Sequence, residues 1–147
     1  MLSKPIWPWY FLAAGLLSVV SVVTGGCRRG DGLNRVVVSG AVKLDGKPVE
    51  DGQIRYIPVG DTQGPVSVSR IEHGQYVCQD FGGVPAGEHR VEILVWDPNI
   101  PHPSGPGLPP RPQWAPEKYN KNSELVATVD ASRDMKATDW NLQSAVK

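Results

Sequence analysis

Residues 36–58 read VVVSGAVKLDGKPVEDGQIRYIP, and this stretch decides the fold class. Over residues 36–44, large apolar side chains recur at even positions, whereas the odd positions from Ser39 to Lys43 are small or polar. A period of two is that of a strand with one buried face. Asp45-Gly46 then supplies the positive φ that a tight turn needs. The inward-facing residues predicted for this strand are Val36, Val38, Val42 and Leu44.

The second half of the stretch predicts another strand. Residues 50–52 (Glu-Asp-Gly) resemble a second turn, and residues 53–58 follow with Ile54 and Tyr56 on one face. Pro58 ends this strand or places it at an edge, because proline has no backbone N–H to donate to a ladder.

Further strands are predicted along the rest of the chain, each bounded by Gly, Pro, Asp or Asn. In the strand over 88–96, Val91, Ile93 and Val95 face inward, and Glu92 between them faces solvent. Seven short strands with no helical period predict an all-β domain, a β-sandwich, over residues 35–147. The five later strands are expected at 66–71, 75–80, 88–96, 124–130 and 137–143.

A proline-rich loop interrupts this pattern at residues 97–123, which hold eight of the fourteen prolines. So long a segment without a strand or helix pattern is typical of a functional or an irregular loop. Its composition favours polyproline II or irregular backbone, so we expect no regular structure there. The prolines are Pro98, Pro101, Pro103, Pro106, Pro109, Pro110, Pro112 and Pro116.

The first 26 residues differ in composition from everything after them. Lys4 is their only charge, residues 6–23 are apolar or small, and Thr24-Gly25-Gly26 precede Cys27. A basic start, an apolar stretch and a small-residue site indicate a secretory signal. Its end resembles a bacterial lipoprotein signal, which implies cleavage before Cys27 and lipidation, including palmitate, at that cysteine. Thr24 stands where that signal usually has Leu.

An uncleaved membrane anchor is the alternative, because the apolar stretch is just long enough to span. Arg28 and Arg29 oppose it, since they would lie on the side that must cross. In both interpretations residues 27–34 are a polar tether, and the chain is exported and attached to a membrane of the bacterial cell envelope.

Three segments together resemble a known family. They are VSGAVKLDGKPVEDGQIRYIPV (38–59), GQYVCQDFGGVPAGEHRVEI (74–93) and EKYNKNSELVATVDA (117–131). In this order they resemble small bacterial lipoproteins with a carboxypeptidase-regulatory-like, or transthyretin-like, domain. The resemblance implies a seven-stranded prealbumin-like β-sandwich, and it implies no catalytic residues.

The composition and the motifs argue against several function classes. The 15 basic and 15 acidic residues cancel, so nothing draws the chain to nucleic acid. No nucleophile elbow, paired-histidine zinc helix or phosphate-binding glycine loop occurs. His73, His89 and His102 are not spaced as a metal site and are expected at rim or surface positions. We therefore expect no catalytic residue, no metal and no cofactor.

Aromatic residues flank the proline-rich loop and are the candidate ligand contacts: Trp96, Trp114 and Tyr119. They could stack on a sugar or on a proline-rich partner, or they could simply fix the loop to the domain. Cys78 shares a face with Tyr76 and is expected to be a small buried hydrophobe. The sequence thus indicates a non-catalytic, membrane-tethered module that binds or scaffolds a ligand it does not identify, a protein or a glycan of the cell envelope. The alternative is a small carbohydrate-binding domain.

Overall fold

Strands dominate the computed structural model, which describes residues 32–100, 111–132, 134 and 138–144. The apolar segment 1–26 and Cys27 lie outside these residues. Among the described residues no helix is long and apolar enough to cross a membrane. The strands are β1 (Arg35–Val36), β2 (Val38–Leu44), β3 (Lys47–Pro48), β4 (Asp51–Pro58), β5 (Ser67–Glu72), β6 (Gln75–Cys78), β7 (Val84–Pro85), β8 (Gly87–Val95), β9 (Val126–Val129) and β10 (Trp140–Leu142), and the 3-10 turns are η1 (Asp80–Gly82) and η2 (Glu117–Tyr119).

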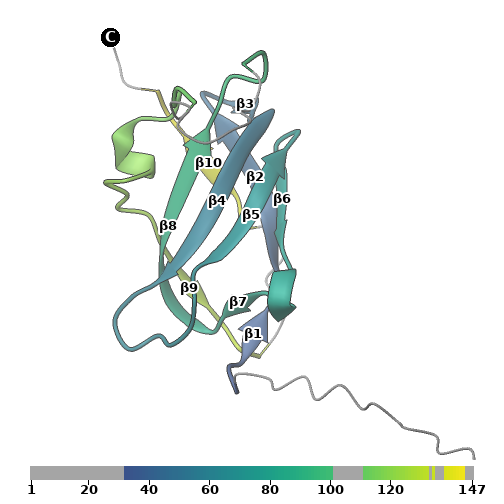
Figure 1. The fold of residues 1–147 in the computed structure, drawn as a ribbon, viewed down its shortest axis with the longest axis vertical. Helices are drawn as coiled ribbons and strands as arrows, with labels where there is room; N and C mark the ends of the chain where they lie inside the picture. Colours follow the sequence, from purple (N-terminus) through teal and green to yellow (C-terminus); the bar gives the residue numbers. More distant parts are fainter. Residues whose placement is uncertain (1–31, 101–110, 133, 135–137, 145–147) are drawn as a thin grey trace, which may run out of the picture.

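One curled sheet forms most of the domain. Its strands run in the order β10-β2-β6-β5-β4-β8-β9, and β3 pairs with β2 beside this path. All of its pairs are antiparallel except β10 with β2, and β1 and β7 form a separate antiparallel pair. The sheet curls so that β2 and β10 lie behind β4 and β8 in Figure 1. The all-β prediction is confirmed.

The inner face of the curled sheet holds the core. In β4, Ile54 and Tyr56 are fully buried, and in β8 Val91 and Ile93 are fully buried opposite them in register. The inward faces predicted for these two strands and for 36–44 are therefore confirmed. Cys78 is also buried and has a free thiol, as predicted.

Of the two turns predicted between the first strands, one is confirmed and the other is wrong in part. Asp45 (φ 51°) and Gly46 (φ 78°) adopt the predicted left-handed turn. The turn predicted at 50–52 is wrong in its second half, because β4 begins at Asp51 and Gly52 is buried within it. A Cβ at Gly52 would lie 2.6 Å from the carbonyl oxygen of Leu94, so the glycine serves close strand approach and not a turn.

Glu92 is buried, and the prediction that it faces solvent is wrong. Its carboxylate accepts hydrogen bonds from the guanidinium of Arg55 on β4 at 3.0 Å and from that of Arg90 at 2.9 Å. Alternation placed Glu92 on the outer face of the sheet. On that face the guanidinium groups of Arg55 and Arg90 enclose the carboxylate, and strand periodicity alone does not reveal that such partners are present.

His89 is fully buried, and the prediction of a rim or surface histidine is wrong. It shares the inward parity of Val91 and Ile93, and its ring packs edge-on against Tyr56 with the centroids 6.0 Å apart. Its Nδ1 lies 3.2 Å from the carbonyl oxygen of Gly87. Burial lowers the pKa of His89, and the Gly87 hydrogen bond only partly opposes this, so the ring is held neutral in the core.

Candidate functional site

The candidate site begins where β8 ends, because a later segment returns to that point. The backbone N–H of Trp114 donates to the carbonyl of Val95 at 2.9 Å, and the side-chain oxygen of Gln113 accepts from the N–H of Val95 at 3.1 Å. Trp96 and Gln113 also form an isolated antiparallel bridge. These bonds bring together Trp96 and Trp114, two of the three candidate ligand contacts.

The two tryptophans line one groove of about 570 Å³. It lies at the end of the molecule that carries β3 and the carboxyl end of β8, away from β1 (Figure 1). Trp114 is 52% exposed there, whereas Trp96 is only partly exposed. The groove is lined by Leu44, Asp45, Lys47, Pro48, Val49, Glu50, Val95, Trp96, Pro98 and Trp114. We call it the tryptophan groove.

A buried arginine holds this part of the loop in place. Arg111 donates from Nη1 to Oδ2 of Asp51 at 2.6 Å and from Nη2 to the carbonyl oxygen of Asp97 at 2.5 Å. Its guanidinium carbon lies 5.3 Å from the ring centroid of Trp96, within cation–π range. Arg111 therefore ties the loop to the first residue of β4 and covers part of the Trp96 ring.

The charge of Asp51 is stabilised by this arrangement. Burial on its own would raise the pKa of Asp51, but the hydrogen bond and charge of Arg111, together with the more distant Arg70 at 3.4 Å, lower it below its ordinary value. Asp51 is therefore ionised at neutral pH, and the buried guanidinium has its counter-ion.

The rim of the groove is polar. Asp45 accepts a hydrogen bond from the backbone N–H of Ser144 at 2.9 Å, and this bond is the main cause of its lowered pKa. Glu50 lies 2.8 Å from Nδ1 of His73. Lys47 adds an ammonium group. An apolar floor with a few polar groups at its edge is typical of a binding groove.

The structure does not place Tyr119 in the groove. This third candidate lies in η2 and packs against the core, and its hydroxyl accepts from the backbone N–H of Gln143 at 3.2 Å. Lys118 extends over its ring, with Nζ 4.9 Å from the centroid. Tyr119 thus joins the loop to the chain after β10. Cys27 lies outside the described residues.

The described second half of the proline-rich loop packs against the domain. Residues 111–123 contain η2 and the buried side chains of Ala115, Asn120 and Ser123. Asn120 donates to the carbonyl of Ala115 at 3.1 Å, and Ser123 donates to that of Val91. Outside η2 and the isolated Trp96–Gln113 bridge the backbone of residues 111–123 is irregular, as the composition predicts, and these side-chain hydrogen bonds fix it in place.

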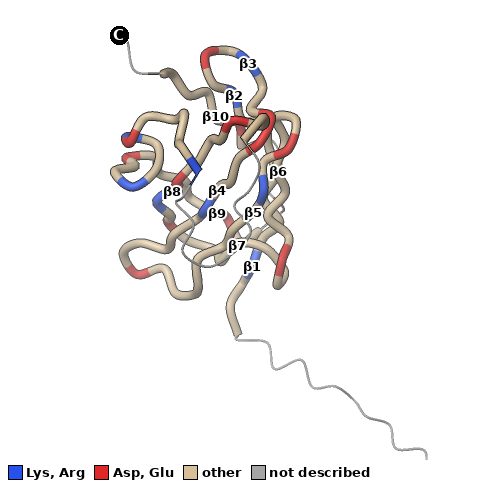
Figure 2. The backbone as a smooth tube through the Cα atoms, turned by 45° about the horizontal axis from the view of Figure 1, so that its top comes forward, with Lys and Arg blue, Asp and Glu red and all other residues tan. Residues whose placement is uncertain are grey.

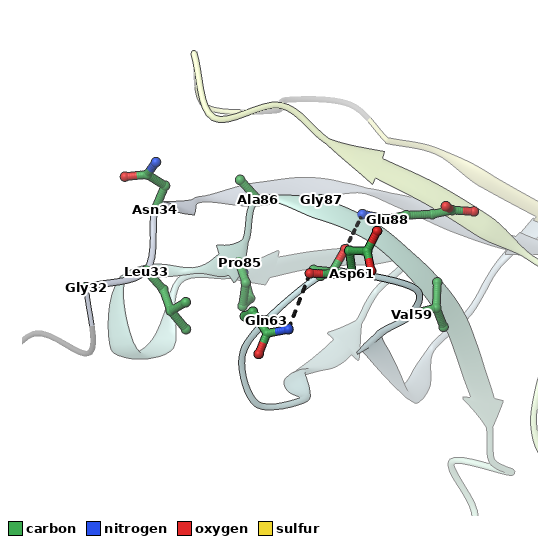
Figure 3. Close-up of a pocket in the computed structure, with 11 residues that line it drawn as sticks. Gly32, Leu33, Asn34, Val59, Asp61, Gln63, Pro85, Ala86, Gly87 and Glu88 are labelled. Carbon is green, nitrogen blue, oxygen red and sulfur yellow. Dashed lines mark hydrogen bonds between the residues drawn. The ribbon is translucent and has the colours of Figure 1, made fainter.

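A second hollow of about 590 Å³ lies at the opposite end, between the first described residues and the connection from β4 to β5 (Figure 3). Two hydrogen bonds lie along its wall: Thr62 accepts from the N–H of Glu88 at 2.8 Å, and Gln63 donates to the carbonyl of Asp61 at 3.4 Å. Its wall has no aromatic ring. Among the described residues no group of three His, Cys, Asp or Glu could hold a metal ion. The tryptophan groove is therefore the better candidate.

No protein-family model, no curated protein and no solved structure matches this chain. The candidate site consequently rests on its own geometry: Trp96 just before the proline-rich loop and Trp114 within it line one groove, where hydrogen bonds join the loop to the end of β8.

Proposed function

We propose that the chain is a non-catalytic bacterial lipoprotein that presents the tryptophan groove to an extended apolar or proline-rich segment of another envelope protein. The observation that carries the proposal is the convergence of Trp96 and Trp114 on one groove at the end remote from β1. The curling that places β2 and β10 behind β4 and β8 gives two layers of strands, which supports a prealbumin-like sandwich of the carboxypeptidase-regulatory-like kind. The apolar segment ending at Cys27 supports a tether on the other side of the domain.

The shape of the groove favours a peptide over a sugar. A sugar-stacking platform needs a flat, exposed aromatic face, and Arg111 lies over the ring of Trp96. Pro48, Pro98 and Trp114 instead form an apolar channel with charged residues at its rim, a form that suits an extended chain. Trp114, half exposed in the free protein, is the anchor that a partner would cover.

Replacing Trp114 by alanine tests the groove. We expect a proline-rich peptide selected from a displayed library against the full chain to lose about thirtyfold or more in affinity, the effect of truncating a central tryptophan anchor. Binding is measured by titration calorimetry. Phe81→Ala is the control, since Phe81 is an even more exposed aromatic in the η1 turn beside β1, away from the groove, and this substitution should leave the peptide affinity unchanged.

Two results would contradict peptide binding at this groove. Unchanged peptide affinity in Trp114→Ala would remove the groove from the interaction. Binding of soluble envelope glycans, abolished by the same variant, would favour the carbohydrate-binding alternative, which the exposed face of Trp114 and the rim carboxylates of Asp45 and Glu50 support.

Replacing Cys27 by serine tests the tether. The variant should lose incorporation of an alkyne palmitate analogue, because serine lacks the sulfur that carries the lipid. Its mass should also remain that of the chain with the segment 1–26 still attached, if the signal peptidase requires the cysteine. Equal labelling of Cys27→Ser and the natural chain would contradict lipidation at this residue, and a labelling-free natural chain in the membrane fraction would favour the uncleaved anchor.

A further inference from the structure

The η1 turn presents an aromatic side chain directly to solvent. Phe81 at its centre is 95% exposed. Its backbone is in the left-handed region (φ 53°, ψ 23°), which is unfavourable for a bulky residue without a compensating contact. Because the ring of Phe81 lies in solvent, it adds no packing to the core that would offset the backbone strain. A strained backbone that displays an apolar ring is typical of a binding feature.

Close backbone packing and hydrogen bonds fix the η1 turn against β1. Gly83 (φ 106°) approaches β1 so closely that a Cβ there would lie 2.1 Å from the carbonyl oxygen of Val36. Arg35 donates from Nη1 to the carbonyl of Gly83 at 3.4 Å, and the Ser67 hydroxyl donates to the same oxygen at 3.3 Å. Phe81 is therefore held at a constant position relative to β1.

Other exposed apolar residues adjoin the turn. Val66 and Val68, at the start of β5, are each 39% exposed. Together with Arg35 and Phe81 they line a shallow hollow of about 190 Å³. We call Phe81, Val66 and Val68 the η1 patch. Arg35 is basic and Asp80 acidic beside it, and Figure 2 shows this mixed charge around β1 and η1.

The η1 patch lies at the end of the domain nearest the anchor. Figure 1 shows η1 beside β1 and β7, at the end where the described chain begins. Cys27 precedes Gly32 by only five residues, which span at most about 17 Å even when fully extended. A domain attached at Cys27 must therefore keep this end close to the bilayer.

We propose that the η1 patch inserts into the surface of the membrane that carries the N-terminal anchor, with Phe81 as the inserted residue. The inference rests on the proposed tether and adds an orientation to it. Apolar rings gain free energy at the boundary between headgroups and acyl chains. The basic residues Arg28, Arg29 and Arg35 suit a leaflet with anionic lipid. Attachment at Cys27 together with insertion of the η1 patch holds the tryptophan groove facing away from the membrane.

Depth-dependent quenching tests the proposal in the full chain reconstituted into phosphatidylethanolamine–phosphatidylglycerol vesicles. An environment-sensitive probe is attached to Val66→Cys, with Phe81 retained, and in a second preparation to Asn99→Cys near the tryptophan groove. Cys78 does not compete for the label, since burial raises the pKa of its thiol to about 12. We expect the probe at residue 66 to lie roughly 5–10 Å below the headgroup boundary and the probe at 99 to remain in water.

Adding Phe81→Ser to the Val66→Cys chain supplies the matched variant. Because Phe81 is almost fully exposed, its loss removes no packing from the fold. The probe at residue 66 should then return to the aqueous emission of the probe at 99. Unchanged membrane quenching without Phe81 would overturn its role as the inserted residue.

The failures of the tether and of the patch are distinguishable. A chain that co-sediments with vesicles but shows equal aqueous emission at residues 66 and 99 would overturn the insertion while keeping the tether. A chain that does not co-sediment would overturn both. Emission that changes with protein concentration but not with lipid would assign the η1 patch to a second copy of the chain and overturn membrane insertion.

Discussion

Replacing Ile93 by alanine is expected to lower the free energy of unfolding by about 2–4 kcal/mol. Ile93 is fully buried in the middle of β8, opposite Ile54 on β4 in the register of the sheet. Truncation removes most of its apolar side chain and leaves a cavity in the core beneath the sheet, which hydrogen-bonded strands can collapse into only in part. Urea unfolding followed by circular dichroism measures the loss.

Val126→Ala is the control for this prediction. Val126 lies on the neighbouring strand β9 and is 55% exposed, so its truncation should change stability by no more than about 0.5 kcal/mol. Glu92 cannot serve as the control, because its buried carboxylate pairs with Arg55 and Arg90. Equal losses for Ile93→Ala and Val126→Ala would mean that the inner face of the sheet has been assigned wrongly.

The inner faces of the strands were predictable because burial imposes a period of two on the sequence. Ile54, Tyr56, Val91 and Ile93 all lie where alternation put them. The same alternation places His89 on the inner face, so its burial could have been predicted from the sequence. It was missed because histidine is polar and is fully buried less often than the aliphatic residues. Glu92 differs, because its burial depends on arginines whose side chains meet it only in the folded sheet.

The candidate site was predictable only in part. The positions of Trp96 and Trp114 on either side of the most proline-rich stretch suggested ligand contacts, and the structure brings both to one groove. Tyr119 fits the same pattern, but hydrogen bonding to Gln143 takes it elsewhere. Arg111 carried no signal, because its partner Asp51 lies sixty positions earlier and only the fold joins them.

The largest effect on the groove is expected from Arg111→Met, which should lower the free energy of unfolding by about 3 kcal/mol, the lower end of the range for breaking a buried ion pair. The side chain of Arg111 is 4% exposed and that of Asp51 is 12% exposed. Methionine retains the length and removes the charge, so Asp51 loses its shorter ion pair, the looser contact with Arg70 remains, and the carbonyl of Asp97 loses a donor.

Arg70→Ala is the matched control, because it removes the other cation on the same carboxylate. Arg70 is 58% exposed, so the loss should lie within about 1 kcal/mol, as for other surface ion pairs. The double variant Asp51→Asn with Arg111→Met should recover part of the stability lost in Arg111→Met, since the half of the pair left in Arg111→Met is then neutral. Equal losses for Arg70→Ala and Arg111→Met would contradict a special role for the buried arginine.

The pH dependence provides an independent measurement on the same pair. The pKa of Asp51 is lower in the folded chain than its ordinary value of 3.8, so the unfolded chain binds more protons near that pH. The stability that the pair contributes is therefore complete above about pH 4 and is lost as the pH falls through the folded pKa. In Arg111→Met the loss of stability at acid pH should be smaller than in the natural chain, because without Arg111 the pKa of Asp51 differs less between the folded and unfolded chain. Without the Arg111 hydrogen bonds to Asp51 and to the carbonyl of Asp97, the loop that carries Trp114 is held less firmly, so peptide affinity at the groove should fall even where the sheet stays folded. An Arg111→Met protein that keeps both its acid sensitivity and its peptide affinity would show that the loop is fixed by its other contacts, the Gln113 and Trp114 hydrogen bonds to Val95.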